Sequence, residues 1–271
     1  MRRFLLPLAL FAALLPAPSI AEEFENPFAM SSEETDAVQE ALDRGQTLYQ
    51  YDQAAWHTTD ALMEDIADPS GAGIRGWVVV PVEQGWLVTY WRPEGDRYLG
   101  VYSAVWDGSG VIDRKVLGPG EAELSDEQVM LIKAGRVPDL STLTRCSDAP
   151  FNSVIMPSGK ASGSAFVYFL TPQISLDSVP MGGHYRFEVL DGQVVDQRQF
   201  TKSCLFLGQP PEGAPKALMV THLLDPVPTE IHVFSVYPAH LPIYVITPEN
   251  HTIWAVEVSG GQPRIRLVKR N

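Results

Sequence analysis

The strongest constraint on the fold is a long run of apolar residues at helical spacing over residues 38–66. Apolar or small residues recur every three to four positions through about eight turns, which is typical of a helix with one buried face. Ser31 or Ser32 is suited to cap this helix, with acidic residues in its first turn. We expect either one long helix or a helix pair divided at Gly45, ended by the Asp-Pro-Ser-Gly sequence at 68–71.

The residues after this helix favour β-structure. Four runs rich in Val, Trp and Tyr are separated by turns that contain Gly or Pro, so they predict an antiparallel meander at 76–81, 86–91, 98–106 and 111–117. A capping-box pattern at Ser125 predicts a short helix that ends near Gly135. Asp191-Gly192 predicts a hairpin turn. Later strands are expected at 165–170, 184–190, 194–200, 217–224, 231–237, 243–247, 253–258 and 264–268.

The predicted fold class is therefore α+β, with a long N-terminal helix or helix pair packed on antiparallel sheet. The C-terminal half is expected to be mostly antiparallel β. We divide the chain into a signal peptide at 1–21, a helix plus antiparallel meander at 22–137, and a β-rich half at 138–271. The last two parts form either separate units or one continuous domain.

The first 21 residues have the three parts of a secretory signal peptide. Arg2 and Arg3 precede an apolar run at 4–15, and small residues stand at Ser19 and Ala21. The apolar run is shorter than the roughly 20 residues that span a bilayer. We therefore expect cleavage near Ala21, a mature protein that is periplasmic or secreted, and no integral membrane span after cleavage.

The chain has two cysteines, Cys146 and Cys204. An even cysteine count in an exported chain favours a disulfide, and a spacing far from C-x-x-C argues against a reactive or metal-binding pair. We therefore predict a structural disulfide between them.

Acidic residues are concentrated near the N-terminus. The whole chain has a net charge of −13, and residues 22–70 contain thirteen acids and one base, Arg44. Such a surface repels nucleic acid, so no nucleic-acid partner is expected. The acids either form a solvated helix face or dock a basic protein partner, and one basic partner is expected within the chain itself, among Arg264, Arg266, Lys269 and Arg270.

The predicted helix carries the first group of candidate site residues. Tyr49, Asp52 and Trp56 share one stripe, with Asp52 at a position where the pattern requires an apolar residue. His57 and Asp60 follow on a neighbouring stripe and are candidates for an acid–base pair. Alternatively, Asp52 forms a buried structural hydrogen bond and His57 lies at the solvated edge.

A second candidate is His184, which follows two glycines and precedes Tyr185. The glycines permit a close backbone approach, but a loop that enters a strand also explains them and is the favoured interpretation. His232 is interpreted as a core histidine within a strand. We predict no metal site and no cofactor, because clustered ligand spacings and the common catalytic and nucleotide-binding motifs are absent from the sequence.

Three segments together resemble an uncharacterised family of exported proteobacterial proteins. They are YDQAAWHTTD, GWVVVPVEQGWLVTYW and GGHYRFEV followed by DGQVV. The resemblance covers most of the mature chain and implies export, but no known activity.

Three hypotheses for function follow. The first is a non-enzymatic, exported protein with an interaction or envelope-associated role through its acidic helix. The second is a hydrolase or metal-dependent enzyme with a site near Asp52, His57 and His184.

The third is a small-ligand carrier, in which Tyr49, Trp56 and Tyr185 are candidates for ligand binding. For the third, the cavity is expected to be β-rich and lined by Trp77, Trp86, Trp91 and Trp106. Oligomeric state is left open.

Overall fold

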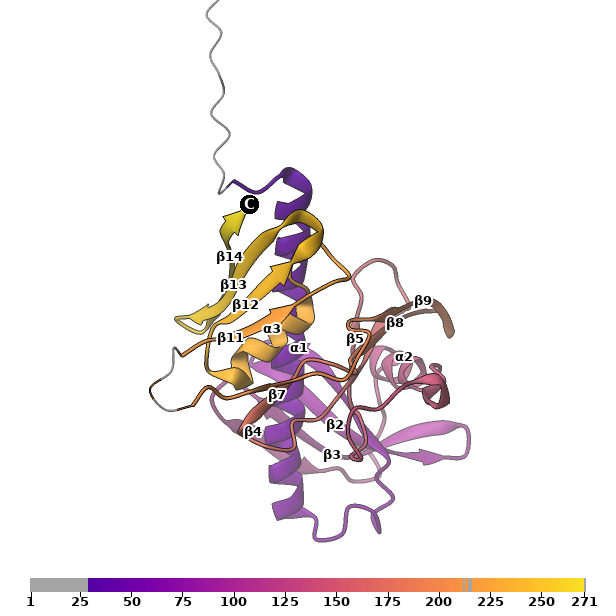
Figure 1. Cartoon of the computed structure of the whole chain (residues 1–271). Helices are drawn as coiled ribbons and strands as arrows, with labels where there is room; N and C mark the ends of the chain where they lie inside the picture. The colour runs from indigo at the N-terminus through magenta and orange to yellow at the C-terminus, as the bar shows by residue number, and fades with distance from the viewer. Residues whose placement is uncertain (1–28, 212, 214–215, 271) are drawn as a thin grey trace, which may run out of the picture.

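The computed structural model describes residues 29–211, 213 and 216–270 (Figure 1). The predicted signal peptide lies outside these residues. The structure confirms the α+β class, with one long helix and several mainly antiparallel sheets.

Helix α1 extends over Ser32–Asp65 as one uninterrupted helix of 34 residues. Ser31 is its N-cap, since its Oγ accepts a hydrogen bond from the Glu34 backbone N–H while the Glu34 carboxylate accepts one from the Ser31 backbone N–H. The helix continues through Gly45, which is buried. Of the two arrangements expected from the sequence, the chain therefore forms one long helix and not a helix pair.

The predicted meander forms the first four-stranded sheet, in the order β1-β2-β3-β4. Its antiparallel pairs place Val79 opposite Val88 and Tyr90 opposite Tyr102, all four buried. Strand bounds are β1 Gly76–Val82, β2 Gly85–Glu94, β3 Arg97–Trp106 and β4 Val111–Val116.

The second sheet has the order β5-β6-β8-β9 and is antiparallel throughout. Asp191 and Gly192 both have positive φ in the β8–β9 turn, as a type I′ hairpin requires. The predicted short helix is α2, Asp126–Gly135, which Ser125 caps through a capping box. Strand bounds are β5 Asn152–Pro157, β6 Ser164–Leu170, β8 Tyr185–Leu190 and β9 Gln193–Gln199.

The third sheet has the order β11-β12-β13-β14, and its first pair is parallel. The connection between the parallel strands contains helix α3, Glu230–Ala239. The prediction of a strand at 231–237 was therefore wrong, and His232 lies on a helix. Strand bounds are β11 Leu218–Thr221, β12 Ile243–Thr247, β13 Thr252–Ser259 and β14 Gln262–Arg270; a small antiparallel ladder joins β7 Ser178–Pro180 to β10 Phe206–Gly208. Two 3-10 turns, η1 Leu140–Thr142 and η2 Pro248–Asn250, complete the element order.

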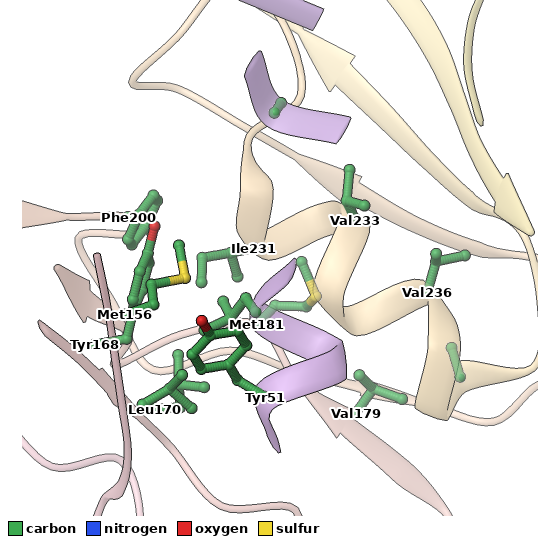
Figure 2. Packing of buried hydrophobic residues seen from close by; sticks show 14 of the residues in the cluster. Tyr51, Met156, Tyr168, Leu170, Val179, Met181, Phe200, Ile231, Val233 and Val236 are labelled. Atoms are coloured by element: carbon green, nitrogen blue, oxygen red, sulfur yellow. The ribbon is translucent and has the colours of Figure 1, made fainter. Parts of the chain in front are cut away.

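Helix α1 runs through the middle of the molecule and contacts strands of all three large sheets (Figure 1). The main hydrophobic cluster combines Leu48 of α1 with residues that are far away in sequence, such as Val88, Tyr168, Val233 and Trp254. Figure 2 shows part of this core, in which Tyr51 of α1 lies among side chains of β5, β6 and α3.

The predicted disulfide between Cys146 and Cys204 is present, with a Cα–Cα distance of 5.3 Å. The predicted pairing of the acidic N-terminal segment with the C-terminal bases is also present, because Arg270 donates to both carboxylate oxygens of Glu34 at 2.7 Å. Within the described part of the chain, none of the helices combines the length and apolar character that crossing a membrane requires.

Candidate functional site

A pocket of about 490 Å³ lies between α1, α3 and the strands β1, β5, β6 and β7. Two of its walls are helices, and the third consists of strands and the segments that connect them. The lining residues are Tyr49, Asp52, Gln53, Ala55, Trp56, Thr59, Trp77, Asn152, Ser153, Val154, Leu170, Thr171, Gln173, Leu176, Val179, Pro180, Phe234, Ser235 and Pro238.

Helix α1 provides the first wall through the stripe identified in the sequence. Tyr49, Asp52 and Trp56 occupy positions i, i+3 and i+7 and all line the pocket. The Tyr49 ring stacks on Tyr237 of α3, with ring centroids 3.9 Å apart and planes 5° from parallel. The Trp56 side chain is 58% exposed, so it stands where the pocket meets solvent.

Helix α3 provides the second wall through Phe234, Ser235 and Pro238. Ser235 is only 1% exposed, and its Oγ has no hydrogen-bond partner among the described residues. Pro238 lies inside the helix and has no N–H, so the carbonyl of Phe234 lacks its normal donor four residues later. This wall therefore contains two hydrogen-bonding groups without their usual partners.

The third wall comes from strands that the sequence did not identify, β5 and β7. Leu170 and Val179 belong both to the pocket lining and to the hydrophobic core drawn in Figure 2. Asn152 and Ser153 lie on β5, an edge strand. Leu176 lies in the β6–β7 connection and is 89% exposed, which adds a second exposed apolar side chain to the pocket lining beside Trp56.

Asp52 is the one charged side chain among the lining residues. Within the part of the chain that the structure describes, its carboxylate accepts a single long hydrogen bond, from the Gln53 side-chain amide at 3.5 Å. Burial raises the pKa of Asp52 to about 6, only partly opposed by the Gln53 hydrogen bond. The side chain is partly accessible because it borders the pocket, while protein surrounds the rest of it. Burial, and then the Asp52 charge, also raise the pKa of Tyr49.

His57 and Asp60 do not line this pocket. The His57 ring stacks between Trp56 and Trp106, with centroid distances of 4.9 and 4.1 Å. Asp60 is exposed, and within the described ranges no hydrogen bond joins it to His57. The structure therefore brings Tyr49, Asp52 and Trp56 together and leaves His57 and Asp60 outside.

His184 is fully buried directly behind the pocket wall. Its Nδ1 accepts a hydrogen bond from the Thr171 backbone N–H at 3.3 Å, and its Nε2 donates to the Pro180 carbonyl at 3.1 Å. Burial lowers the pKa of His184 to about 4, so the ring is neutral at physiological pH. Because Thr171 and Pro180 both line the pocket, His184 fixes the position of the wall without facing the space inside it.

Tyr185 and the two glycines near it have structural contacts. The Tyr185 hydroxyl donates to the Thr144 carbonyl and accepts from the Thr144 backbone N–H, and this residue does not line the pocket. The close approach that the glycines permit is to the disulfide region: a Cβ at Gly182 would lie 2.5 Å from the Leu205 backbone nitrogen, and one at Gly183 2.6 Å from Cys146 Sγ.

A buried ionic cluster, which the sequence did not indicate, lies where α1 and α3 meet β6 and β8. The Glu230 carboxylate accepts from Arg186 at 2.5 Å, from Arg44 at 3.2 Å and from Tyr168 at 3.2 Å. Glu230 and Arg186 are both buried. No local pattern relates Glu230 to Arg44, because the two residues are 186 positions apart and meet only through the packing of α3 against α1.

A second polar cluster surrounds His222. Its Nε2 lies 2.7 Å from Asp225 Oδ2, and Arg198 donates to both oxygens of Asp225 at 2.6 Å. The buried His232 ring contacts the His222 ring edge-to-face at 4.8 Å, and burial lowers its pKa well below the usual value. His232 Nδ1 accepts from the Thr229 backbone N–H, so the ring completes the start of α3. In the part of the chain that the structure describes, no three His, Cys, Asp or Glu side chains are grouped as a metal site.

Comparison with known proteins found no match to a family model, to a curated protein or to a solved structure.

Proposed function

We propose that this protein is an exported binding protein for a small organic molecule, which occupies the pocket between α1, α3 and strands β5 to β7. The observation that carries this proposal is the pocket itself, whose volume of about 490 Å³ lies within the range typical of small-molecule sites. Its lining combines aromatic and apolar walls with a few polar groups, which is the usual composition of such sites.

The position of the histidines favours binding over hydrolysis. His184 has both ring nitrogens engaged by the backbone, and His57 stacks between two tryptophans outside the pocket. A general acid–base residue must lie within hydrogen-bond reach of the proton that it transfers. Among the acid–base candidates, only Asp52 lines the pocket. A single carboxylate can bind a ligand group without a second catalytic residue beside it.

The cavity differs from the one expected for a ligand carrier. It lies beside two helices instead of within a β-rich shell, and only Trp77 of the four strand tryptophans lines it.

Export is supported by the predicted leader and by the disulfide, which is compatible with an oxidising compartment such as the periplasm.

Docking of a basic protein to α1 is the second candidate. It is favoured by the exposed acids Glu33 and Asp36 in the first turns of the helix. It ranks second because other acids of α1 are occupied internally: Glu34 pairs with Arg270, and Glu64 and Asp65 pair with Arg114. Pull-down from a periplasmic extract with the wild type and with Glu33→Gln/Asp36→Asn tests it; equal capture by both proteins contradicts docking through these acids.

A thermal-shift screen of small metabolites tests ligand binding, because a molecule that binds only the native state raises its unfolding temperature. Asn152→Trp should fill the pocket and abolish the shifts that the wild type gives, because Asn152 lies opposite Leu170 on the face of β5 that borders the pocket. Val195→Trp adds the same side chain at an exposed position of β9 outside the lining and should retain them. If no compound shifts the wild type, or if Asn152→Trp responds as the wild type does, the proposal is wrong.

A further inference from the structure

Resting on the proposed binding function, we propose that the ligand carries a protonated amine joined to an aromatic or apolar body, with the Asp52 carboxylate as the partner of the ammonium group. Four features of the pocket support this ligand class.

The first feature is the charge of the lining. Asp52 is the only charged lining residue, so no cationic side chain of the lining compensates its charge. Among the described residues, its only hydrogen bond is the 3.5 Å contact from Gln53, at the limit of hydrogen-bond distance. A carboxylate that is largely shielded from water is stable only when it is paired or well hydrogen-bonded. The partner that this carboxylate lacks within the described part of the chain is a cation or a strong hydrogen-bond donor, and an ammonium group is both.

The second feature is the position of the C-terminal end of α3. Arg44 of α1 contacts Glu230 at the start of α3, and Tyr49, further along α1, stacks on Tyr237, near the end of α3. The C-terminal end of α3 therefore lies near Tyr49, one turn of α1 before Asp52. Asp52 and Pro238, in the last turn of α3, line the same pocket. The C-terminal end of a helix carries partial negative charge, which adds to that of Asp52 and favours a cation.

The third feature is a backbone acceptor on α3. The Phe234 carbonyl lacks its helical donor because Pro238 has no N–H, and both residues line the pocket. An ammonium group has three N–H donors and no acceptor. A primary amine therefore retains donors for this carbonyl after it pairs with the Asp52 carboxylate.

The fourth feature is the aromatic lining, which provides for the rest of the ligand. Tyr49, Trp56, Trp77 and Phe234 bring four aromatic rings to one pocket. Aromatic faces attract cations as well as apolar groups, so they suit a molecule in which both are adjacent.

Three probes with the same indole body separate charge from shape: tryptamine, which is cationic, tryptophol, which is neutral, and indole-3-propionate, which is anionic. Isothermal titration calorimetry at pH 7.5 should show tryptamine binding the wild type at least roughly tenfold more tightly than tryptophol, as expected for a charge-assisted hydrogen bond. Indole-3-propionate should bind most weakly, because its carboxylate is repelled by Asp52.

Asp52→Asn should lower tryptamine affinity by roughly tenfold or more and leave tryptophol affinity within about threefold. Asp60→Asn removes an exposed acid of the same helix outside the lining and should leave both affinities unchanged. Equal binding of tryptamine and tryptophol, or an amine preference that survives in Asp52→Asn, would overturn the amine assignment and leave the proposed binding function intact. Binding of none of the three probes by the wild type would also overturn it, whereas the proposed function is tested separately, by the metabolite screen and by the position of the compounds that the screen finds.

Discussion

Gly45 of α1 lies directly against Val233 of α3. A Cβ at position 45 would lie 2.7 Å from Val233 Cγ1 and 2.8 Å from the Glu230 carbonyl oxygen, well inside van der Waals contact. The absence of a side chain at Gly45 therefore lets the two helices approach closely, and these helices form two walls of the pocket.

Gly45→Ala should destabilise the protein by about 1–3 kcal/mol, although alanine is the better helix former, because the added methyl overpacks the helix contact. Urea unfolding measures the change. Gly110→Ala is the control, since a Cβ there meets nothing within 4 Å. A Gly45→Ala protein as stable as the wild type would contradict this packing.

Asp52→Asn should stabilise the ligand-free protein at neutral pH. The folded pKa of Asp52 is raised from 3.8 to about 6, so the native state favours the protonated form, and stability is lost as the pH rises from about 3.8 to about 6. The neutral variant should gain about 1–3 kcal/mol over the wild type at pH 7.5, and this advantage should shrink as the pH falls to 4.5. The free energy of unfolding at the two pH values checks this, with Asp60→Asn as control. An advantage that is the same at both pH values would show that Asp52 is not desolvated.

Glu230→Ala should be strongly destabilising, by about 3–5 kcal/mol, because it leaves Arg186 buried without its carboxylate partner. Burial opposes the charged form of Arg186, yet the Glu230 charge and hydrogen bond, together with Tyr168, outweigh burial and raise the pKa of Arg186. Glu83→Ala, at an exposed position, should change stability by less than about 0.5 kcal/mol. Chemical denaturation compares the two, and similar small losses would mean that the cluster is not structurally important.

Reduction of the Cys146–Cys204 disulfide should lower stability by about 2–4 kcal/mol, since the bond closes a loop of 58 residues in the unfolded chain. Thermal unfolding with and without a reducing agent measures this. The Cys146→Ser/Cys204→Ser protein should match the reduced wild type and show no response to reductant. An unfolding temperature that does not change on reduction would contradict a stabilising role.

Local patterns predicted much of the fold. The stripe at 38–66, the capping signals at Ser31 and Ser125, and the Asp191-Gly192 turn each correspond to an element of the structure. The error at 231–237 has a physical reason: the segment is short and mostly apolar, so periodicity does not separate a strand from a buried helix. Two features favour α3 over a strand: the hydrogen bond of His232 at its start and its close packing against Gly45. The packing against Gly45 is a tertiary contact, which the local sequence does not reveal.

The candidate site was only partly predictable, because most of its walls come together through tertiary contacts. Asp52 stood out because a carboxylate interrupts an apolar stripe, and Tyr49 and Trp56 share its face. The opposite walls come from α3 and from β5 to β7, which are about 100 to 190 residues away along the chain. No local pattern brings Ser153, Thr171 or Ser235 to that stripe, because their meeting depends on how the sheets pack around α1.

The most direct test of the binding site is a crystal structure of the protein in complex with the tightest-binding compound from the metabolite screen. The compound should lie between α1 and α3, in contact with Tyr49 and Trp56 and within hydrogen-bond distance of the Asp52 carboxylate. A compound bound elsewhere on the protein, with this pocket empty or filled by side chains, would contradict the proposed function.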